Sequence, residues 1–130
     1  MSLRITAVDL ENAAISATWL DLLDHYARDP MGGGVGLSAY ARTHLVDELK
    51  RLPTFHGALA WRGEKAVGLI NCFAGFSTFA ARPLLNIHDI VVHADARRQG
   101  IGQALLQWAE RRARQLGCCK LTLEILSGNT

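Results

Sequence analysis

Residues 89–106 read DIVVHADARRQGIGQALL, and this stretch decides the fold. Within it an apolar strand is followed by a turn in which Gly100 and Gly102 flank one residue, and then by apolar residues at helical spacing. Glycines at a strand-to-helix turn let the backbone approach a ligand and point successive N–H groups into one concavity. The unpaired amides and the positive dipole end of the next helix suit a phosphate or pyrophosphate.

Two arginines, Arg97 and Arg98, precede this turn and add charge and directional hydrogen bonds for an anion. The turn lacks the third glycine of the dinucleotide fingerprint and the Gly-Lys-Ser/Thr ending of the nucleotide loop. A Rossmann oxidoreductase is therefore disfavoured. A tight strand-to-helix connection that binds no ligand stays open as an alternative.

The segments around this turn alternate between strand and helix patterns. We expect strands at 3–8, 55–61, 66–76, 85–92 and 120–126, and helices at about 10–28, 39–52 and 101–116, with Asp9 and Ser38 as N-caps of the first two. The order predicts a mixed α/β (α+β) fold, with a central mixed sheet flanked by helices, and a parallel, right-handed crossover as its last unit. We expect a single domain over residues 1–130.

Composition narrows the class of protein. With 130 residues, 49% of them hydrophobic, the chain can bury one real core. Lys and Arg number 14 against 12 Asp and Glu, so no nucleic-acid partner is indicated. No window approaches a membrane-spanning length and no targeting segment is seen, which predicts a soluble, cytoplasmic protein without a membrane partner.

The three cysteines, Cys72, Cys118 and Cys119, are an odd number with two adjacent in sequence. That arrangement is a poor basis for a disulfide framework or a metal site. We expect reduced cysteines with packing roles and no bound metal.

The run at 89–106 closely resembles the acetyl-CoA motif of the GNAT acetyltransferase superfamily, which has the pattern Q/R-x-x-G-x-G/A after an apolar strand. The later run LTLEILSGN, residues 121–129, resembles the next family segment, in which a strand ends before an asparagine that opens another helix. Both motifs occur in order, and a looser match extends back through the predicted hairpin. The resemblance implies a GNAT-like fold, of a small bacterial type, and acetyl-CoA as co-substrate.

Carried over to this chain, the resemblance implies that the pantetheine arm lies along the backbone of one strand and the pyrophosphate on the amides of the turn. It assigns the cofactor to Ile90, Val91, Val92, Arg97, Arg98, Gln99, Gly100, Ile101, Gly102, Gln103 and Asn129.

The resemblance also implies direct attack of a primary amine on the thioester, helped by a general base, without a covalent nucleophile. Glu124 is the first candidate base, because a glutamate has that role at the matching place in relatives that acetylate ribosomal-protein N-termini. Its alternative is a solvent-facing strand residue. Asp89 is the second candidate, and it could equally hold a loop or steer a cationic substrate. His88 and His93, at strand ends, are more simply explained as structural residues.

The acceptor amine, on a small molecule or a peptide, is expected between two groups of residues. Tyr26 and Asp29 lie on one side and Phe76, Ser77 and Arg82 on the other, although each also fits an ordinary surface position. A catalytically weak or silent acyl-CoA-binding module remains the alternative function. An α/β domain that binds some other phosphate ligand is a third.

The chain ends at Thr130, where the resemblance calls for another helix and two more strands. The last strand would then be an uncovered edge, which invites association. We therefore expect either a C-terminally shortened form of a longer protein or a homodimer in which a second copy covers that edge.

Overall fold

The computed structural model describes residues 2–29 and 33–123. Over this part of the chain the strands and helices follow in the order β1 (Leu3–Ala7), α1 (Ala13–Arg28), α2 (Ala39–Lys50), β2 (Phe55–Arg62), β3 (Lys65–Ser77), β4 (Arg82–Val92), the 3-10 turn η2 (Ala94–Ala96), α3 (Ile101–Gln115) and β5 (Leu121–Leu123). The predicted mixed α/β class is confirmed. The strand predicted at 120–126 appears as β5, and residues 124–126 lie outside the described range.

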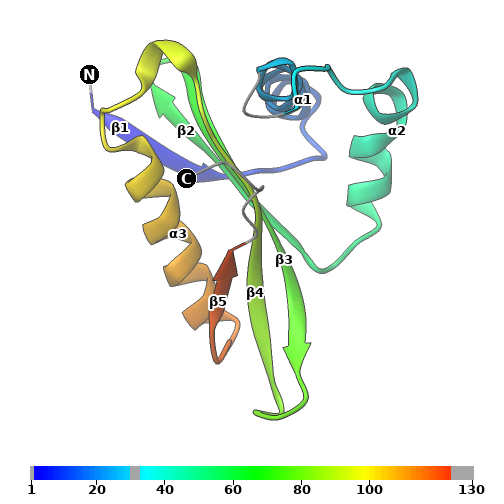
Figure 1. Ribbon diagram of the computed structural model, residues 1–130, viewed down its shortest axis with the longest axis vertical. Coiled ribbons are helices and arrows are strands. Elements are labelled where there is room, and N and C mark those ends of the chain that lie inside the picture. The colour runs from blue at the N-terminus through cyan, green and yellow to red at the C-terminus, as the bar shows by residue number, and fades with distance from the viewer. Residues whose placement is uncertain (1, 30–32, 124–130) are drawn as a thin grey trace.

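The strands form one sheet in the order β1-β2-β3-β4-β5. Neighbours are antiparallel except β4 and β5, which are parallel and are joined through α3, as the sequence predicted. Helix α3 covers one face of the sheet, while α1 and α2 cover the other (Figure 1). The sheet is therefore buried on both sides, between two separate cores.

The two cores follow from the alternation of side chains along β2. Ala58 and Ala60 are small and pack under α3, in a core that contains Ile101 and Leu105. Leu59, which lies between them on the strand, faces α1 and α2, in a core that contains Trp19.

Helix α1 begins later than predicted. Its N-cap is Asn12, whose side chain accepts a hydrogen bond from the Ile15 amide at 3.1 Å. Asp9, the predicted cap, instead accepts from the Glu11 amide at 3.0 Å and closes a turn before the helix. Both are good capping residues, so residue type alone did not separate them. The predicted cap Ser38 of α2 is confirmed.

Strands β3 and β4 are longer than predicted. Ser77 pairs with Arg82, so the expected irregular connection is a tight hairpin turn over residues 78–81. Pro83 lies inside β4, near its start, and its carbonyl accepts a hydrogen bond from the Cys119 amide at 2.9 Å. The hairpin end of β3 and β4 extends well below the helices (Figure 1).

The cysteines are free, as predicted, but they do not all pack. Cys72 is fully buried, and burial raises the pKa of its thiol to about 12, so it remains protonated at neutral pH. Cys118 is half-buried, while Cys119 is exposed at the turn after α3, so the packing role expected for Cys119 is wrong. None of the helices in the described residues is both long and apolar enough to cross a membrane.

Candidate active site

The glycine turn connects β4 to α3 and begins the helix without a side-chain cap. Gly100 is the N-cap, with a φ of 77°, a conformation that glycine adopts without steric cost. Over the described part of the chain, the amides of residues 98–103 donate to no backbone or side-chain acceptor. These amides gather at a helix N-terminus, where the dipole also favours negative charge. The turn can therefore hold an anionic group through its main chain.

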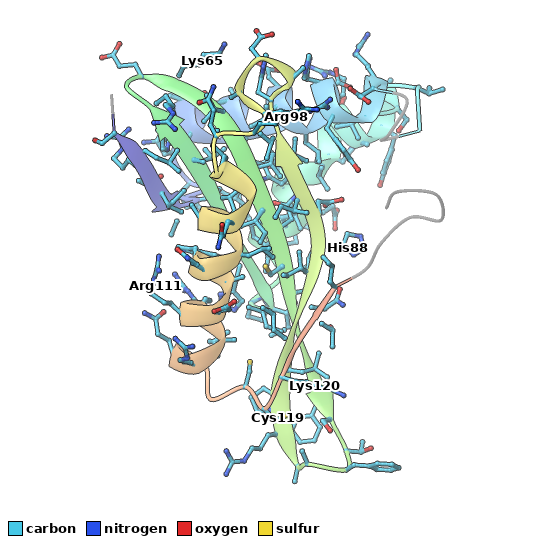
Figure 2. The ribbon with its side chains drawn as sticks, turned by 60° about the vertical axis from the view of Figure 1, so that its left-hand side comes forward. Lys65, His88, Arg98, Arg111, Cys119 and Lys120 are labelled. Atoms are coloured by element: carbon cyan, nitrogen blue, oxygen red, sulfur yellow. The ribbon has the colours of Figure 1, made fainter. Side chains whose placement is uncertain are left out.

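Arg98 lies within this turn in the left-handed region, with a φ of 67°. A non-glycine residue rarely adopts that conformation, and such strain is often found where a ligand binds. Its side chain is exposed and lies at the same end of the sheet as Lys65 (Figure 2). The positive charges at this end complement an anion on the turn.

The two neighbouring side chains of the turn have protein partners. Arg97 Nη2 donates to Asp29 Oδ2 at 3.3 Å, which links the turn to the end of α1. Gln99 Oε1 accepts from Arg62 Nε at 3.2 Å, which links it to β2. Arg97 and Asp29, predicted for the cofactor and the acceptor respectively, therefore lie together.

The predicted pantetheine strand is the far half of β4. Residues 90–92 pair with residues 68–70 of β3 on one side. On the other side, β5 pairs only with residues 85–87. Within the described residues, the outer backbone edge of residues 90–92 thus has no strand partner. An extended ligand with amide groups can hydrogen-bond to such an edge as an added strand would.

A β-bulge interrupts β4 at His88. Asp89 pairs with Asn71 and Ile87 pairs with Cys72, so His88 is an extra residue between two paired positions. Before the bulge Ile87 packs beneath α3, and after it Ile90 does, so the alternation changes phase at this point. His88 and Asp89, adjacent in sequence, consequently line the same cavity on the α1 and α2 face.

This cavity has a volume of about 350 Å³, within the range of small-molecule sites. It lies between the first two helices and the sheet and is lined by Trp19, Leu23, Tyr26, Ala27, Leu37, Leu45, Leu49, Asn71, Phe73, His88 and Asp89. His88, about midway along β4, marks its position in Figure 2. The ring of His88 meets Phe73 edge to face, with 5.5 Å between ring centroids.

A short hydrogen-bond chain orients the carboxylate of Asp89. Trp19 Nε1 donates to Asn71 Oδ1 at 2.8 Å, and Asn71 Nδ2 donates to Asp89 Oδ2 at 3.1 Å. The indole N–H can only donate, so the Asn71 carbonyl must face it and the amide N–H must face the carboxylate. Asn71 is 3% exposed, and this pairing satisfies a buried polar group.

His93, the other histidine that the sequence analysis explained as structural, follows the end of β4. His93 stacks on His25 of α1, with ring centroids 4.7 Å apart and the planes within 4°. Its Nδ1 accepts from the Asp95 amide at 3.1 Å, which supports the structural reading. Burial, followed by the charge of Lys65, lowers the pKa of His93.

The five predicted acceptor residues do not come together. Tyr26 lines the cavity and Asp29 lies beside the glycine turn. Phe76, Ser77 and Arg82 lie at the tip of the β3–β4 hairpin, where Ser77 pairs with Arg82. This tip is at the opposite end of the sheet from the glycine turn (Figure 1).

Two predicted site residues, Glu124 and Asn129, lie outside the described residues. Sequence reasoning also missed part of the site, namely Trp19 and Asn71. The available signal was Asn71 itself, a polar side chain inside the apolar run of β3. A buried amide needs hydrogen-bond partners, and the partners of Asn71 are Trp19 and Asp89, which both line the cavity.

Comparison with known proteins agrees with this geometry. A model of the acetyltransferase (GNAT) family matches residues 19–130. The aminoalkylphosphonate N-acetyltransferase of Salmonella typhimurium (strain LT2) is 40% identical over 65 residues, which are 50% of this chain and 42% of that protein. The matched segment thus spans less than half the length of that relative.

Solved structures share the fold at low sequence identity. A ribosomal-protein-alanine N-acetyltransferase from Brucella melitensis biovar Abortus 2308 has a TM-score of 0.77 and 19% identity, covering 98% of this chain and 82% of its own. A transcriptional regulator from Bacillus halodurans C-125 has a TM-score of 0.80 and 22% identity, covering 96% and 83%. Such different descriptions show that the fold alone does not fix the activity. Because the family model matches most of this chain, residues 19–130, the chain belongs to the GNAT acetyltransferase family.

Proposed function

We propose that this chain transfers an acetyl group from acetyl-CoA to a primary amine held in the cavity between α1, α2 and the sheet. The observation that carries the proposal is the order of features along one strand. On β4, His88 and Asp89 line the cavity, residues 90–92 follow with an outer edge that pairs with no strand of the described residues, and the glycine turn comes next. A ligand that runs along this strand would meet all three in sequence.

The residues present fit acetyl-CoA. The unpaired amides of residues 98–103 suit a pyrophosphate, and the charges of Arg97 and Arg98 complement it. At Gly102 an added Cβ would meet only Val92 Cγ2, at 3.9 Å, so the backbone is accessible from that side. When bound, acetyl-CoA supplies an acetyl group already activated as a thioester.

The protein's part in the reaction is to bind, orient and deprotonate the amine. An alkylamine is protonated at neutral pH and must lose a proton before its nitrogen can attack. Asp89, oriented by Asn71, can accept hydrogen bonds from the ammonium of an amine in the cavity. A positioned general base typically contributes about 10²–10⁴-fold to the rate.

Two carboxylates are candidates for the base. Glu124 is favoured by the family resemblance, and Asp89 by its place in the cavity wall. We propose Asp89 as the group that holds the ammonium, while Glu124 stays a candidate for the proton transfer. Because the reaction uses acetyl-CoA, we also propose the cytoplasm as its location.

The test is release of free thiol from acetyl-CoA in the presence of a panel of amines, with calorimetry of CoA binding alongside. The panel includes alkylamines, arylalkylamines, 2-aminoethylphosphonate, an aminoglycoside and a peptide with an N-terminal alanine. Amine-dependent thiol release supports the proposal. CoA binding without release from any amine supports the silent acyl-CoA-binding module, and the absence of CoA binding overturns both.

A further inference from the structure

The walls of the cavity are unevenly divided between apolar and charged groups. Aromatic and aliphatic side chains dominate: Trp19, Leu23, Tyr26, Leu37, Leu45, Leu49 and Phe73. Among the described residues that line it, Asp89 is the one carboxylate, and none is a lysine or an arginine. An occupant that carried a second, anionic group would therefore meet apolar surface and a like charge, with no lysine or arginine among these residues to compensate it.

Two arginines of the helices, Arg28 and Arg42, are ion-paired with Asp24. Arg28 Nε and Arg42 Nη1 both bind Asp24 Oδ2, at 2.9 and 2.8 Å, and the Leu37 amide donates to Asp24 Oδ1 at 2.8 Å. Asp24 is 7% exposed and ties α1 to α2 and to the segment before it. These contacts place both guanidinium groups at the helix–helix junction, and neither arginine is among the described residues that line the cavity.

The carboxylate of Asp89 is held in place and retains binding capacity. Asn71 donates to Oδ2, one of the two carboxylate oxygens. A carboxylate offers about four lone-pair sites, so an ammonium can still be bound. Since the Asn71 amide is fixed in turn by Trp19, the carboxylate is preorganised rather than free to rotate.

The size of the cavity restricts the body of the occupant. A volume of about 350 Å³ is near the lower end of the about 300–1,000 Å³ typical of ligand sites. It suits one ring or a branched chain on a short linker. Aromatic walls supplied by α1 and β3 would pack against such a body.

We propose that the acceptor is a small monocationic amine with an aromatic or branched aliphatic body and no anionic group. This inference rests on the proposed function, because it names the substrate class of the same cavity. Asp89 binds the ammonium and the apolar walls bind the body. An amine that carries a phosphonate or a carboxylate is excluded by charge.

The experiment compares three probes by calorimetry on CoA-saturated protein: phenethylamine, 2-phenylethanol as its neutral counterpart, and 2-aminoethylphosphonate as the anionic amine. We expect phenethylamine to bind at least tenfold more tightly than either of the others. The Asp89→Asn variant, whose fold is checked by circular dichroism, should bind phenethylamine no more tightly than 2-phenylethanol. Leu52→Ala, at an exposed position beyond α2 and outside the cavity wall, is the matched control and should bind as the wild type does.

Two results would overturn the inference. One is binding of 2-aminoethylphosphonate as tight as that of phenethylamine, and the other is no measurable binding of phenethylamine. The wild-type comparison decides both even if Asp89→Asn fails to fold. Thiol release is read separately: selective binding without release contradicts the acetyl-transfer proposal alone, whereas release with a preference for the phosphonate contradicts the substrate class alone.

Discussion

Replacing Gly102 by valine tests whether the glycine turn binds CoA through its backbone. In the free protein an added Cβ at this position meets only Val92 Cγ2, at 3.9 Å, which is ordinary contact. The φ of Gly102 is not in the left-handed region, and valine is a somewhat better helix former than glycine. We therefore expect the melting temperature of Gly102→Val to stay the same or rise slightly.

The same substitution should weaken CoA binding. The branched side chain stands beside the amides of residues 98–103 and keeps a pyrophosphate from reaching them. A hydrogen bond to a charged group is worth about 1.5–3 kcal/mol, so the loss of one such contact corresponds to an increase in Kd of about 10- to 150-fold.

Isothermal calorimetry with CoA measures this effect, and Gln107→Val provides the matched control. Gln107 is an exposed residue later in α3, so the same side chain is introduced into the same helix away from the turn. We expect its Kd to remain within about twofold of the wild type. Equal affinities of Gly102→Val and Gln107→Val would refute the backbone-binding argument, provided that both proteins melt as the wild type does.

Three other predictions follow from named contacts. Asp89→Asn should lower turnover about a hundredfold or more while leaving CoA affinity unchanged; if Asp89→Asn has no such effect, Asp89 does not hold the ammonium, and a loss of turnover in Glu124→Gln would assign the proton transfer to Glu124. The folded state lowers the pKa of His93 below its ordinary value of 6.5, so the unfolded chain binds the proton first as the pH falls. The stability that neutral His93 contributes is therefore complete above pH 6.5 and is lost as the pH falls below that value. His93→Asn, which keeps an acceptor for the turn, should therefore show a shallower loss of melting temperature between neutral and acidic pH, and an unchanged slope would contradict this. Gly68→Ala should cost about 1–3 kcal/mol, because its Cβ would lie 2.8 Å from a backbone carbonyl oxygen of β4. Gly75→Ala, near the exposed hairpin end with 3.3 Å to a leucine side chain, should cost clearly less in the same denaturant titration.

Local signals in the sequence predicted much of the fold. The helix capped by Ser38 and the helix that starts after Gly100 each depend on residues within a few positions of each other, and both were placed correctly. The parallel pairing of β4 with β5 followed from the handedness of strand-helix-strand units. The glycine turn was recognised from its own residues, because the function proposed for it depends on main-chain amides.

The cavity proposed to hold the acceptor depends on contacts between distant residues, which the sequence pattern does not reveal. Trp19 and Asn71 are 52 positions apart, and their hydrogen bond is what directs the Asn71 amide toward Asp89. The bulge that turns His88 to the same side as Asp89 exists only because β4 pairs with β3 in one register. Residues near the hairpin, such as Phe76, were expected beside the cavity, because a long connection was predicted where the strands in fact continue.

The central claim is that this protein transfers the acetyl group of acetyl-CoA to the nitrogen of an amine substrate. Mass spectrometry of the products formed from isotope-labelled acetyl-CoA and phenethylamine tests it most directly. The account predicts labelled N-acetylphenethylamine and free CoA in equal amounts, formed by the wild type and at least a hundredfold more slowly by Asp89→Asn. Release of CoA with labelled acetate and no N-acetylated product, from phenethylamine or from any amine of the panel, would contradict it.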